Sequence, residues 1–407
     1  MLSFKEALRL IESRNIDLIE GEKIIFSNGI NRVLFKNIHA CNDMPLFDTS
    51  SMDGYAFCYD DLNLLIENGL EISSINKAGN ENDEILKRGT CIKTFTGSKM
   101  PKDSDTMILV EDVNVKNGMI FLKENASISK GGWIRKKGEN YRKNDILFKR
   151  GQVLSAFSMG LLAQNNNIYI EVFRKPRIAL LPIGDEILEL GEIPNIKNYI
   201  YSSNNHLLNA IFSSMGCEVI LYPLIKDNKK LIKDSIKEAL KNCDIVITTG
   251  GMSKGDFDFT KDVIGDFGEV VIDGINIRPG RVSAYVACQN KHIFALPGNP
   301  ISSVVVSLLF IRLIIQKMLC IEANLPIKKA KLAKKIINND ARVCFLPSSI
   351  SFQNGMYMAS IMENFQSYKL DSLKDAFVVI DTKVIEANEE VDVIFLNDLL
   401  NLENKGE

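Results

Sequence analysis

Between Pro176 and Ile321 the chain alternates apolar, strand-like runs with helical segments, and this alternation constrains the fold more than any other feature of the sequence. The runs RIALLPIG, EVILYPLI and DIVITTGG read as strands, and the amphipathic segment KKLIKDSIKEALKNC separates the last two. Continuous apolar strands separated by helices are typical of a parallel sheet that helices cover on both faces. We therefore predict a central, doubly wound, mostly parallel α/β domain.

The segments on either side of this region have a different texture. Before Pro176, short strand-like runs alternate with turns rich in glycine and charge, and after Pro326 short strands return. A chain of 407 residues is long enough for several domains of roughly 100–200 residues each. We predict a multidomain α/β and β protein with a discontinuous domain I (1–44 and 139–175), an inserted β-rich domain II (45–138), the α/β domain III (176–322) and a small β-barrel-like domain IV (323–407).

Composition excludes several classes of function. The 49 basic and 51 acidic side chains give a net charge of -2, so no global field would attract nucleic acid. The eight cysteines include no Cys-x-x-Cys pair, which argues against a structural zinc site and against a secreted disulfide framework. The three histidines are not spaced as metal ligands, so imidazole chemistry is not expected.

Two segments bear on location. The N-terminus reads as a capped amphipathic helix and lacks the basic and apolar regions of a signal peptide. The most apolar stretch, Val304–Ile315, is shorter than the ~20 residues that a membrane span needs, and Arg312 interrupts it. We expect a buried helix there, no membrane association and a cytoplasmic protein.

In an open α/β sheet, ligands bind beyond the carboxyl ends of the strands and at helix N-termini. Three loops of the predicted sheet fall at such positions. The first is Gly184-Asp185-Glu186, which directly follows a predicted strand. Its two acids could hold a hard cation such as Mg²⁺ through oxygen ligands. On this motif alone, a pair of helix-capping acids with no ligand is the preferred interpretation.

The second loop, Thr248–Asp258, follows the strand DIVITTGG. Gly250 and Gly251 would let the backbone approach a ligand closely and leave amides free to cradle an anion, and Asp258 adds a carboxylate. The string matches neither a Walker A loop nor a dinucleotide fingerprint. A functional loop explains the whole string better than a plain connection does.

The third loop, Leu296–Ser303, places Pro297 and Pro300 around a Gly-Asn turn before the apolar helix. A helix start offers unpaired amides and a partial positive charge to an oxyanion, although proline at this position also has a purely structural explanation. Upstream, Arg278 and Arg281 flank a Pro-Gly turn. Guanidinium forks suit phosphate, and a solvated charged turn is equally consistent with the motif alone.

The N-terminal half adds hydroxyls and acids. Asp53 lies in PLFDTSSMDGYAF, Thr96 in TFTGSKMP, and Asp145 near Trp133; each could be ordinary loop surface. The residues alone therefore predict an α/β domain that handles an oxyanion or a phosphate, with carboxylates for a divalent cation and no histidine or cysteine catalyst. They do not name a substrate.

Several strings occur in the order found in the MoeA family, to which the E domain of gephyrin belongs. They are PLFDTSSMDGYAF, TFTGSKMPKDSDTMILVED, PIGDEI, TTGGMSKGDFDFTKD, INIRPGR and LPGNPISS. The chain resembles this family over nearly its whole length. The resemblance implies an elongated homodimer of four-domain subunits with a MogA/MoaB-like α/β domain, and an active site between that domain of one subunit and the N-terminal region of the other.

The resemblance also implies an activity, that of a molybdopterin molybdenumtransferase. Such an enzyme takes adenylylated molybdopterin and molybdate, releases AMP and forms molybdenum cofactor with the help of Mg²⁺. A pterin-adenylylating protein would be the upstream partner. Carried over by motif, the catalytic residues are Asp53, Thr96, Glu186, Asp227 and Asp258, with Glu186 and Asp258 as the metal ligands. The substrate- and anion-binding residues are Gly250, Gly251, Ser253, Arg278, Arg281, Pro297, Gly298, Asn299, Pro300, Asp145, Arg342 and Ser367.

The chain departs from the family pattern at several positions. Gly274 stands where many relatives have a lysine, Ile183 replaces a hydroxyl residue, Ser98 replaces an alanine, the residue before Ser367 is not glycine, and Arg278 and Arg281 replace lysines. These changes affect the details of anion binding, while every expected carboxylate is present.

Two alternatives share these residues. A molybdopterin adenylyltransferase would use the same glycine loop, but would not need the N- and C-terminal segments. A non-catalytic, gephyrin-like scaffold would keep the fold, but nothing structural demands the carboxylates. Molybdate and tungstate have nearly the same size and charge, so the sequence accommodates either.

Overall fold

A computed structural model describes residues 1–79, 84–194, 198–251, 259–361 and 373–402. The chain divides into two compact units. The first contains residues 1–36, 150–159 and 169–407, and the second contains residues 37–149 and 160–168. The second unit is thus an insertion between β1 (Gly21–Ile25) and β12 (Tyr169–Phe173), which pair with each other in antiparallel register within the first unit.

The first unit is built around a six-stranded sheet. Its first four strands are parallel to one another, and the last two run antiparallel to their neighbours. In order across the sheet, the strands are β16 (Glu218–Leu221), β13 (Arg177–Pro182), β17 (Ile245–Thr249), β21 (Lys291–Leu296), β20 (Ala284–Cys288) and β18 (Glu269–Asp273). This is the mostly parallel sheet that the apolar runs predict.

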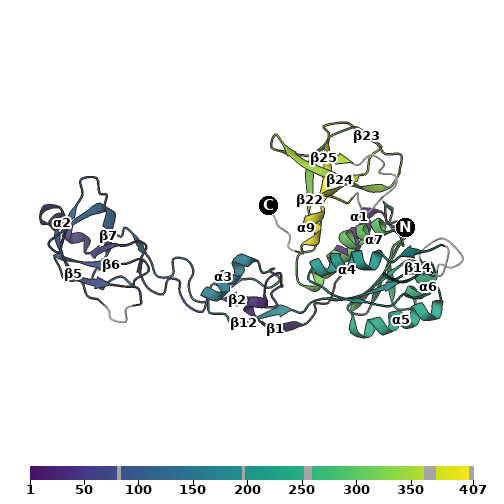
Figure 1. Cartoon of the computed structure of the whole chain (residues 1–407), viewed down its shortest axis with the longest axis horizontal. Helices are drawn as coiled ribbons and strands as arrows, with labels where there is room; N and C mark the ends of the chain where they lie inside the picture. Colours follow the sequence, from purple (N-terminus) through teal and green to yellow (C-terminus); the bar gives the residue numbers. More distant parts are fainter. Residues whose placement is uncertain (80–83, 195–197, 252–258, 362–372, 403–407) are drawn as a thin grey trace. The chain divides into compact units, whose positions relative to one another are not determined.

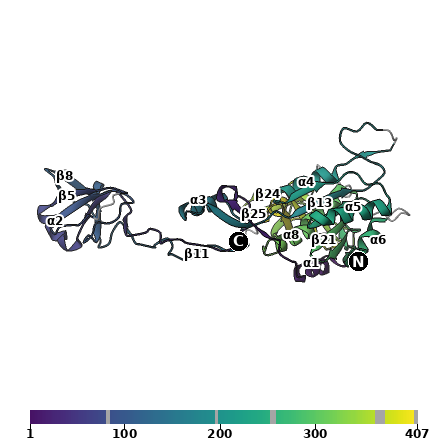
Figure 2. The same cartoon turned by 90° about the horizontal axis from the view of Figure 1, so that it is seen from below.

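Helices cover both faces of this sheet (Figures 1 and 2). Alternate residues of β13 enter different cores: Ile178 and Leu180 pack with α4 (Asn204–Ser214) and the apolar helix, whereas Ala179 and Leu181 pack with α5 (Lys229–Asn242) and α6 (Phe259–Gly265). A strand that is apolar on both sides is what a doubly covered sheet requires. The predicted doubly wound α/β class is confirmed.

The apolar helix spans Pro300–Met318 as α7 (Pro300–Val306), a π-helical turn η4 (Ser307–Ile311) and α8 (Arg312–Met318). Of the described residues, only this helix is long and apolar enough to cross a membrane, and 94% of its apolar window is buried inside the fold. Arg312 is fully buried, and its guanidinium donates to the carbonyls of Asn401 and Asn324. Burial lowers the pKa of Arg312 to about 10. The expected buried core helix is confirmed.

A small barrel follows this helix. Its strand β24 pairs with both β25 and β26, so that five strands close into a ring. The ring contains β24 (Val343–Gln353), β25 (Met356–Ile361), β22 (Ile327–Leu332), β28 (Glu390–Phe395) and β26 (Ala376–Ile380). Leu332, Leu346 and Val393 belong to its core. The short strand β19 (Ile277–Arg278) joins the edge of β24 in parallel, which sets Arg278 opposite Cys344. The expected β-barrel-like domain is confirmed.

The second unit carries a six-stranded sheet of its own, which confirms the predicted β-rich N-terminal region. The core contains Tyr55, Phe57, Cys91, Ile108 and Ile120. In order, the strands are β7 (Thr106–Leu109), β4 (Gly54–Phe57), β6 (Thr90–Thr94), β5 (Leu70–Asn76), β9 (Met119–Leu122) and β8 (Val113–Lys116), with helix α2 at Leu62–Asn68.

Short elements complete the fold. Helix α1 (Phe4–Ser13) begins with the capping box of Ser3 and Glu6, as the sequence predicts, and buries Phe4 and Ile11. The others are β2 (Ile38–His39) with β11 (Ile146–Phe148), β3 (Thr49–Ser50) with β10 (Ile134–Arg135), β14 (Ile187–Leu188) with β15 (Ile200–Tyr201), β23 (Ile336–Ile337) with β27 (Val384–Ile385), α3 (Ala156–Gln164) and α9 (Leu396–Leu400).

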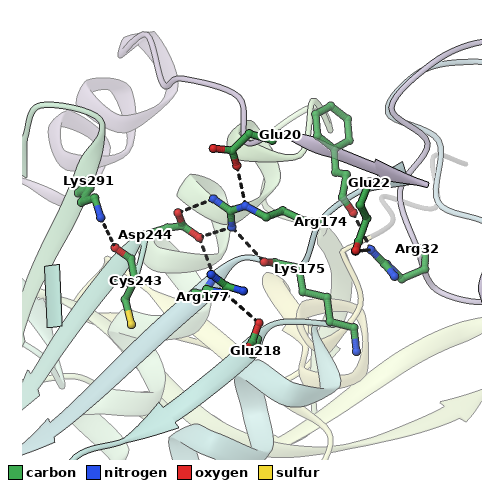
Figure 3. A network of polar contacts seen from close by, with 11 residues as sticks. Glu20, Glu22, Arg32, Arg174, Lys175, Arg177, Glu218, Cys243, Asp244 and Lys291 are labelled. Atoms are coloured by element: carbon green, nitrogen blue, oxygen red, sulfur yellow. Dashed lines mark hydrogen bonds and ion pairs between the residues drawn. The ribbon is translucent and has the colours of Figure 1, made fainter. Parts of the chain in front are cut away.

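An ionic network ties the end of β12 to the start of β17 (Figure 3). Arg174 donates from two nitrogens to both oxygens of Asp244, at 2.7 and 2.8 Å, and from Nε to Glu20 at 2.6 Å. The backbone N–H of Arg177 also donates to Asp244, at 2.8 Å. Burial opposes ionisation of Asp244, but the bonds from Arg174 and Arg177 hold the pKa of this carboxyl below its usual value. The network is a structural anchor at the edge of the sheet opposite the glycine loops.

Candidate active site

The three loops singled out from the sequence lie at one edge of the sheet. Their strands end in register, because Pro182 pairs with Thr249 and Thr249 pairs with Leu296. The chain therefore leaves β13, β17 and β21 at the same level, and the Gly184, Gly250 and Pro297 loops are neighbours. This is the carboxyl edge, where open α/β sheets bind ligands.

Backbone crowding makes glycine necessary in the second loop. Gly250 has a φ of +91°, and a Cβ at this position would lie 2.2 Å from the carbonyl oxygen of Ile183. A Cβ on Gly298 would lie 3.8 Å from the Cα of Gly250, so the second and third loops approach each other closely. Gly251 also has positive φ, at +63°. The backbone is therefore exposed to a ligand where side chains are absent.

The third loop is rigid for reasons that the structure supplies. Oδ1 of Asn299 accepts from the backbone N–H of Ser302 at 3.1 Å, which caps α7, and Pro300 occupies the first turn of the helix. The hydroxyl of Ser303 donates to the carbonyl of Pro297 at 2.7 Å. Pro297, Gly298, Asn299 and Pro300 thus lie beside Gly250 in a fixed turn.

Carboxylates gather at the same edge. Asp227 follows β16, and its Oδ2 accepts from the N–H of Asp185 at 3.3 Å. Burial, together with repulsion from Asp185 and Glu186, raises the pKa of Asp227 despite that bond. Glu186 itself is exposed. The segment after Glu186 is strand β14 rather than a helix, so the helix-capping interpretation of these acids is wrong.

The described residues do not by themselves form a metal centre: within the ranges that the structure covers, no three histidine, cysteine, aspartate or glutamate side chains are grouped to hold an ion. Three residues predicted from the sequence, Ser253, Asp258 and Ser367, lie outside the described residues. The repulsion among Asp227, Asp185 and Glu186 is nevertheless the electrostatic setting that a divalent cation relieves.

Two of the predicted arginines meet at a carboxylate that sequence analysis missed. Arg342 donates to Asp340 from Nε at 2.7 Å and from Nη2 at 2.5 Å, and Arg278 donates to the same carboxylate at 3.2 Å. The side chain of Arg342, and then its backbone N–H, keep the pKa of Asp340 far below its usual value although partial burial opposes this. The spacing of Asp340 and Arg342 by two residues was the only local signal of this pair.

Arg281 ends the turn that begins at Arg278, and Gly274 lies beside Arg281. Arg281 is exposed, with Nε 3.3 Å from Sδ of Met1. Gly274 has a φ of +78°, and a Cβ there would lie 3.0 Å from Cγ of Met1 and 3.2 Å from the carbonyl of Arg281. A lysine at this position would be strained, which explains why glycine suits this backbone.

The second unit holds the remaining predicted residues. The backbone N–H and the hydroxyl of Thr96 both donate to Oδ1 of Asp53, at 2.8 and 2.6 Å. These bonds, the hydroxyl first, lower the pKa of the exposed Asp53. The pairing of Gly54 with Thr94 brings the two together from β4 and β6. Asp145 accepts from the N–H of Arg142 at 2.7 Å and closes a turn in the same unit.

Fold and site together define the class of this protein. It is a multidomain α/β protein whose carboxyl edge combines open glycine backbone with carboxylates, and whose α/β domain is joined to a barrel and an inserted β unit. Residues 2–165 match the family described as the MoeA N-terminal region (domain I and II), and residues 179–317 match the one described as a probable molybdopterin binding domain.

Individual relatives agree with this class. The chain is similar to molybdopterin molybdenumtransferases of Haemophilus influenzae (30% identity, 74% of this chain and 73% of the relative) and of Nostoc sp. (30%, 70% and 67%). A solved structure of the molybdopterin biosynthesis MoeA protein from Pyrococcus horikoshii is similar over 97% of this chain and 99% of that one, with a TM-score of 0.81 and 28% identity. The chain belongs to the molybdopterin molybdenumtransferase (MoeA) family.

Proposed function

We propose that this protein inserts molybdenum from molybdate into adenylylated molybdopterin, releasing AMP and forming molybdenum cofactor. One observation carries the proposal: in a chain of this family, Gly250, Gly251 and Gly298 open the backbone at the carboxyl edge directly beside the Asp227 carboxylate. Exposed amides suit a phosphoanhydride or an oxyanion, and the carboxylates suit a cation that neutralises it.

Each part of the site has a separate task in this proposal. The glycine and proline loops hold the phosphoanhydride, while Arg278 and Arg342 hold molybdate near the dithiolene. Holding both reactants in place supplies much of the rate by proximity. Glu186 and Asp258 would hold Mg²⁺, and the ion would favour cleavage of the phosphoanhydride by neutralising its charge. Asp227 lies beside the second loop, since a Cβ on Gly251 would lie 3.6 Å from its Oδ1. No protein nucleophile is required.

We further propose that the working form is a cytoplasmic homodimer with a shared active site. Asp53 and Thr96 belong to one compact unit, and Glu186, Asp227 and Arg342 belong to the other. In the proposed dimer, the N-terminal region of one subunit completes the carboxyl edge of its partner. A pterin-adenylylating protein supplies the substrate.

Reconstitution tests the function. The purified protein is mixed with adenylylated molybdopterin, Mg²⁺ and molybdate, and the products are added to a cofactor-free molybdoenzyme. We expect molybdate-dependent activation that is lost in Asp258→Ala. Bound substrate without activation, with molybdate and with tungstate, would support a scaffold. Formation of the adenylylated pterin from ATP would support an adenylyltransferase.

Complementation tests the shared site. Asp53→Ala and Asp227→Ala are each expected to be inactive, and co-expression of the two differently tagged chains gives mixed dimers. One of the two sites in a mixed dimer is free of substitutions if each site draws on both subunits. Activity recovered to about half of the wild-type value per mixed dimer supports the proposal. Mixed dimers without activity would show that each site lies within one subunit.

A further inference from the structure

Within the part of the chain that the structure describes, buried polar atoms without a hydrogen-bond partner are concentrated at one place. Among the described residues, six buried side-chain atoms have no hydrogen-bond partner. Five of them lie at the carboxyl edge of the α/β sheet: Asn204 Oδ1, Asn205 Oδ1, Asp227 Oδ1, Thr260 Oγ1 and Ser283 Oγ. Buried polar groups in folded proteins nearly always have partners, so a cluster of exceptions calls for an explanation such as a missing ligand.

Asn204 and Asn205 begin α4, which has 11 residues and is labelled in Figure 1. The residue before them, Ser203, makes no side-chain capping bond. The first amides of a helix have no partner within it and attract negative charge. By itself an uncapped helix start identifies no ligand.

The asparagine side chains supply the independent observation. Asn205 is 2% exposed and lies on the same face of α4 as Leu208 and Phe212, which pack against the sheet. The first turn of α4 lies at the carboxyl edge, beside the third loop. Asn204 donates from Nδ2 to the carbonyl of Gly298 at 2.9 Å, which fixes α4 to the third loop. Both Oδ1 atoms are thus held at the edge without a donor among the described residues.

We infer that the start of α4, with Asn204 and Asn205, binds a phosphate ester that carries O–H or N–H donors beside the phosphate. The helix amides take the phosphate, and the two amide oxygens accept from the neighbouring donors. Molybdate does not fit, because a fully ionised oxyanion brings no donor to Oδ1 of Asn205. This inference rests on the proposed function, in which both halves of the substrate, the adenylate and the pterin, have this chemistry.

The test uses Asn205→Leu in the full chain. Leucine has nearly the shape of asparagine, and replacing an unpartnered buried polar group by an apolar one of the same shape is neutral or stabilising. We expect an unchanged or higher melting temperature together with an affinity for AMP, or for molybdopterin without adenylate, that is at least about tenfold lower. Loss of AMP affinity assigns the adenylate half, and loss of molybdopterin affinity assigns the pterin half.

Ser307→Ala is the matched control. Oγ of Ser307 is the sixth unpartnered atom, but it lies in the π-helical turn of the core helix, away from the carboxyl edge. This variant is expected to bind both ligands as the wild type does. Unchanged affinity for both ligands in Asn205→Leu, or an equal loss in Ser307→Ala, would overturn the inference.

A second variant and the choice of assay conditions guard against an ambiguous result. If Asn205→Leu does not fold, the partly exposed Asn204 is changed to alanine and the same affinities decide. Affinities are measured without molybdate. The two proposals can therefore fail separately. If ligand affinity depends on Asn205 but the protein does not activate a molybdoenzyme, the proposed function is contradicted and this inference stands.

Discussion

Arg342 and Asp340 form a two-point ion pair, with Nε–Oδ1 at 2.7 Å and Nη2–Oδ2 at 2.5 Å. The backbone N–H of Arg342 donates to the same carboxylate at 3.0 Å. A guanidinium that is held at two points has a fixed plane, which a freely rotating side chain would not have. Asp340 therefore determines where the positive charges of Arg342 and Arg278 lie.

Replacing Asp340 with asparagine should weaken the binding of molybdate. The amide cannot hold both guanidiniums, so we expect a KM for molybdate that is about tenfold higher, with little change in the affinity for AMP. Steady-state titration with molybdate measures this. Asp381→Asn, an exposed change on the same barrel, is the control. An equal loss of affinity for both ligands would show that Asp340 merely supports the fold.

The same carboxyl makes stability depend on acid. The folded-state pKa of Asp340 is below its unfolded value of about 3.9, so its contribution is present above that value and is lost as the pH falls toward the folded pKa. Below pH ~4, wild type and Asp340→Asn should become more alike in their free energy of unfolding.

Thr96 should keep the pKa of Asp53 below its usual value. Thr96→Val removes the 2.6 Å hydroxyl bond and keeps the bond from the backbone N–H. The pKa of Asp53 then rises toward its usual value. As the pH is lowered, the variant should therefore lose activity at a higher pH than the wild type does. A pH–rate profile checks this, and Thr96→Ser should restore it. Thr90→Val, at the opposite end of β6, should leave the profile unchanged.

The Asp227 carboxylate should lower the stability of the fold while it supports activity. Since its folded-state pKa is raised, the protein gains stability as the pH falls through that pKa, and the ionised carboxylate is unfavourable at neutral pH. Asp227→Asn should therefore unfold at a higher temperature while its turnover falls about 100-fold. Melting curves and turnover test the pair of effects, with the exposed Asp234→Asn as control. A variant that is less stable and still active would contradict this.

Asp244 should be the most sensitive member of the network in Figure 3. Asp244→Asn leaves Arg174 without its two-point partner. Because this pair is only partly buried, we expect a cost of about 2 kcal/mol, between the values typical of exposed and of buried pairs. Glu218→Gln breaks the exposed pair with Arg177 and should cost less than about 1 kcal/mol. Urea unfolding compares the two. Similar losses would mean that the network does not anchor the sheet.

Sequence patterns predicted those parts of the fold that burial determines. The runs before Pro182 and Thr249 are apolar on both sides, which only a sheet covered on two faces explains. The helix that contains Arg312 is buried, as predicted. It tolerates this charge because the carbonyls of Asn324 and Asn401 accept hydrogen bonds from the guanidinium.

Features that depend on contacts between distant segments could not be predicted from the sequence. Asp340 became visible only when the pairing of β19 with β24 brought Arg278 beside it. The acids after Gly184 were open to a capping interpretation, because nothing local shows that β14 follows. The unpartnered oxygens of Asn204 and Asn205 depend on where α4 docks, so a helical pattern alone could not single them out.

The coupling of AMP release to molybdenum insertion tests the central claim most directly. A single turnover with adenylylated molybdopterin, Mg²⁺ and limiting molybdate is quenched, and AMP and protein-bound molybdenum–pterin product are both quantified. The proposed function predicts one AMP for each molybdenum inserted and no AMP when molybdate is left out. AMP released at the same rate without molybdate, or molybdenum inserted without AMP, would contradict it.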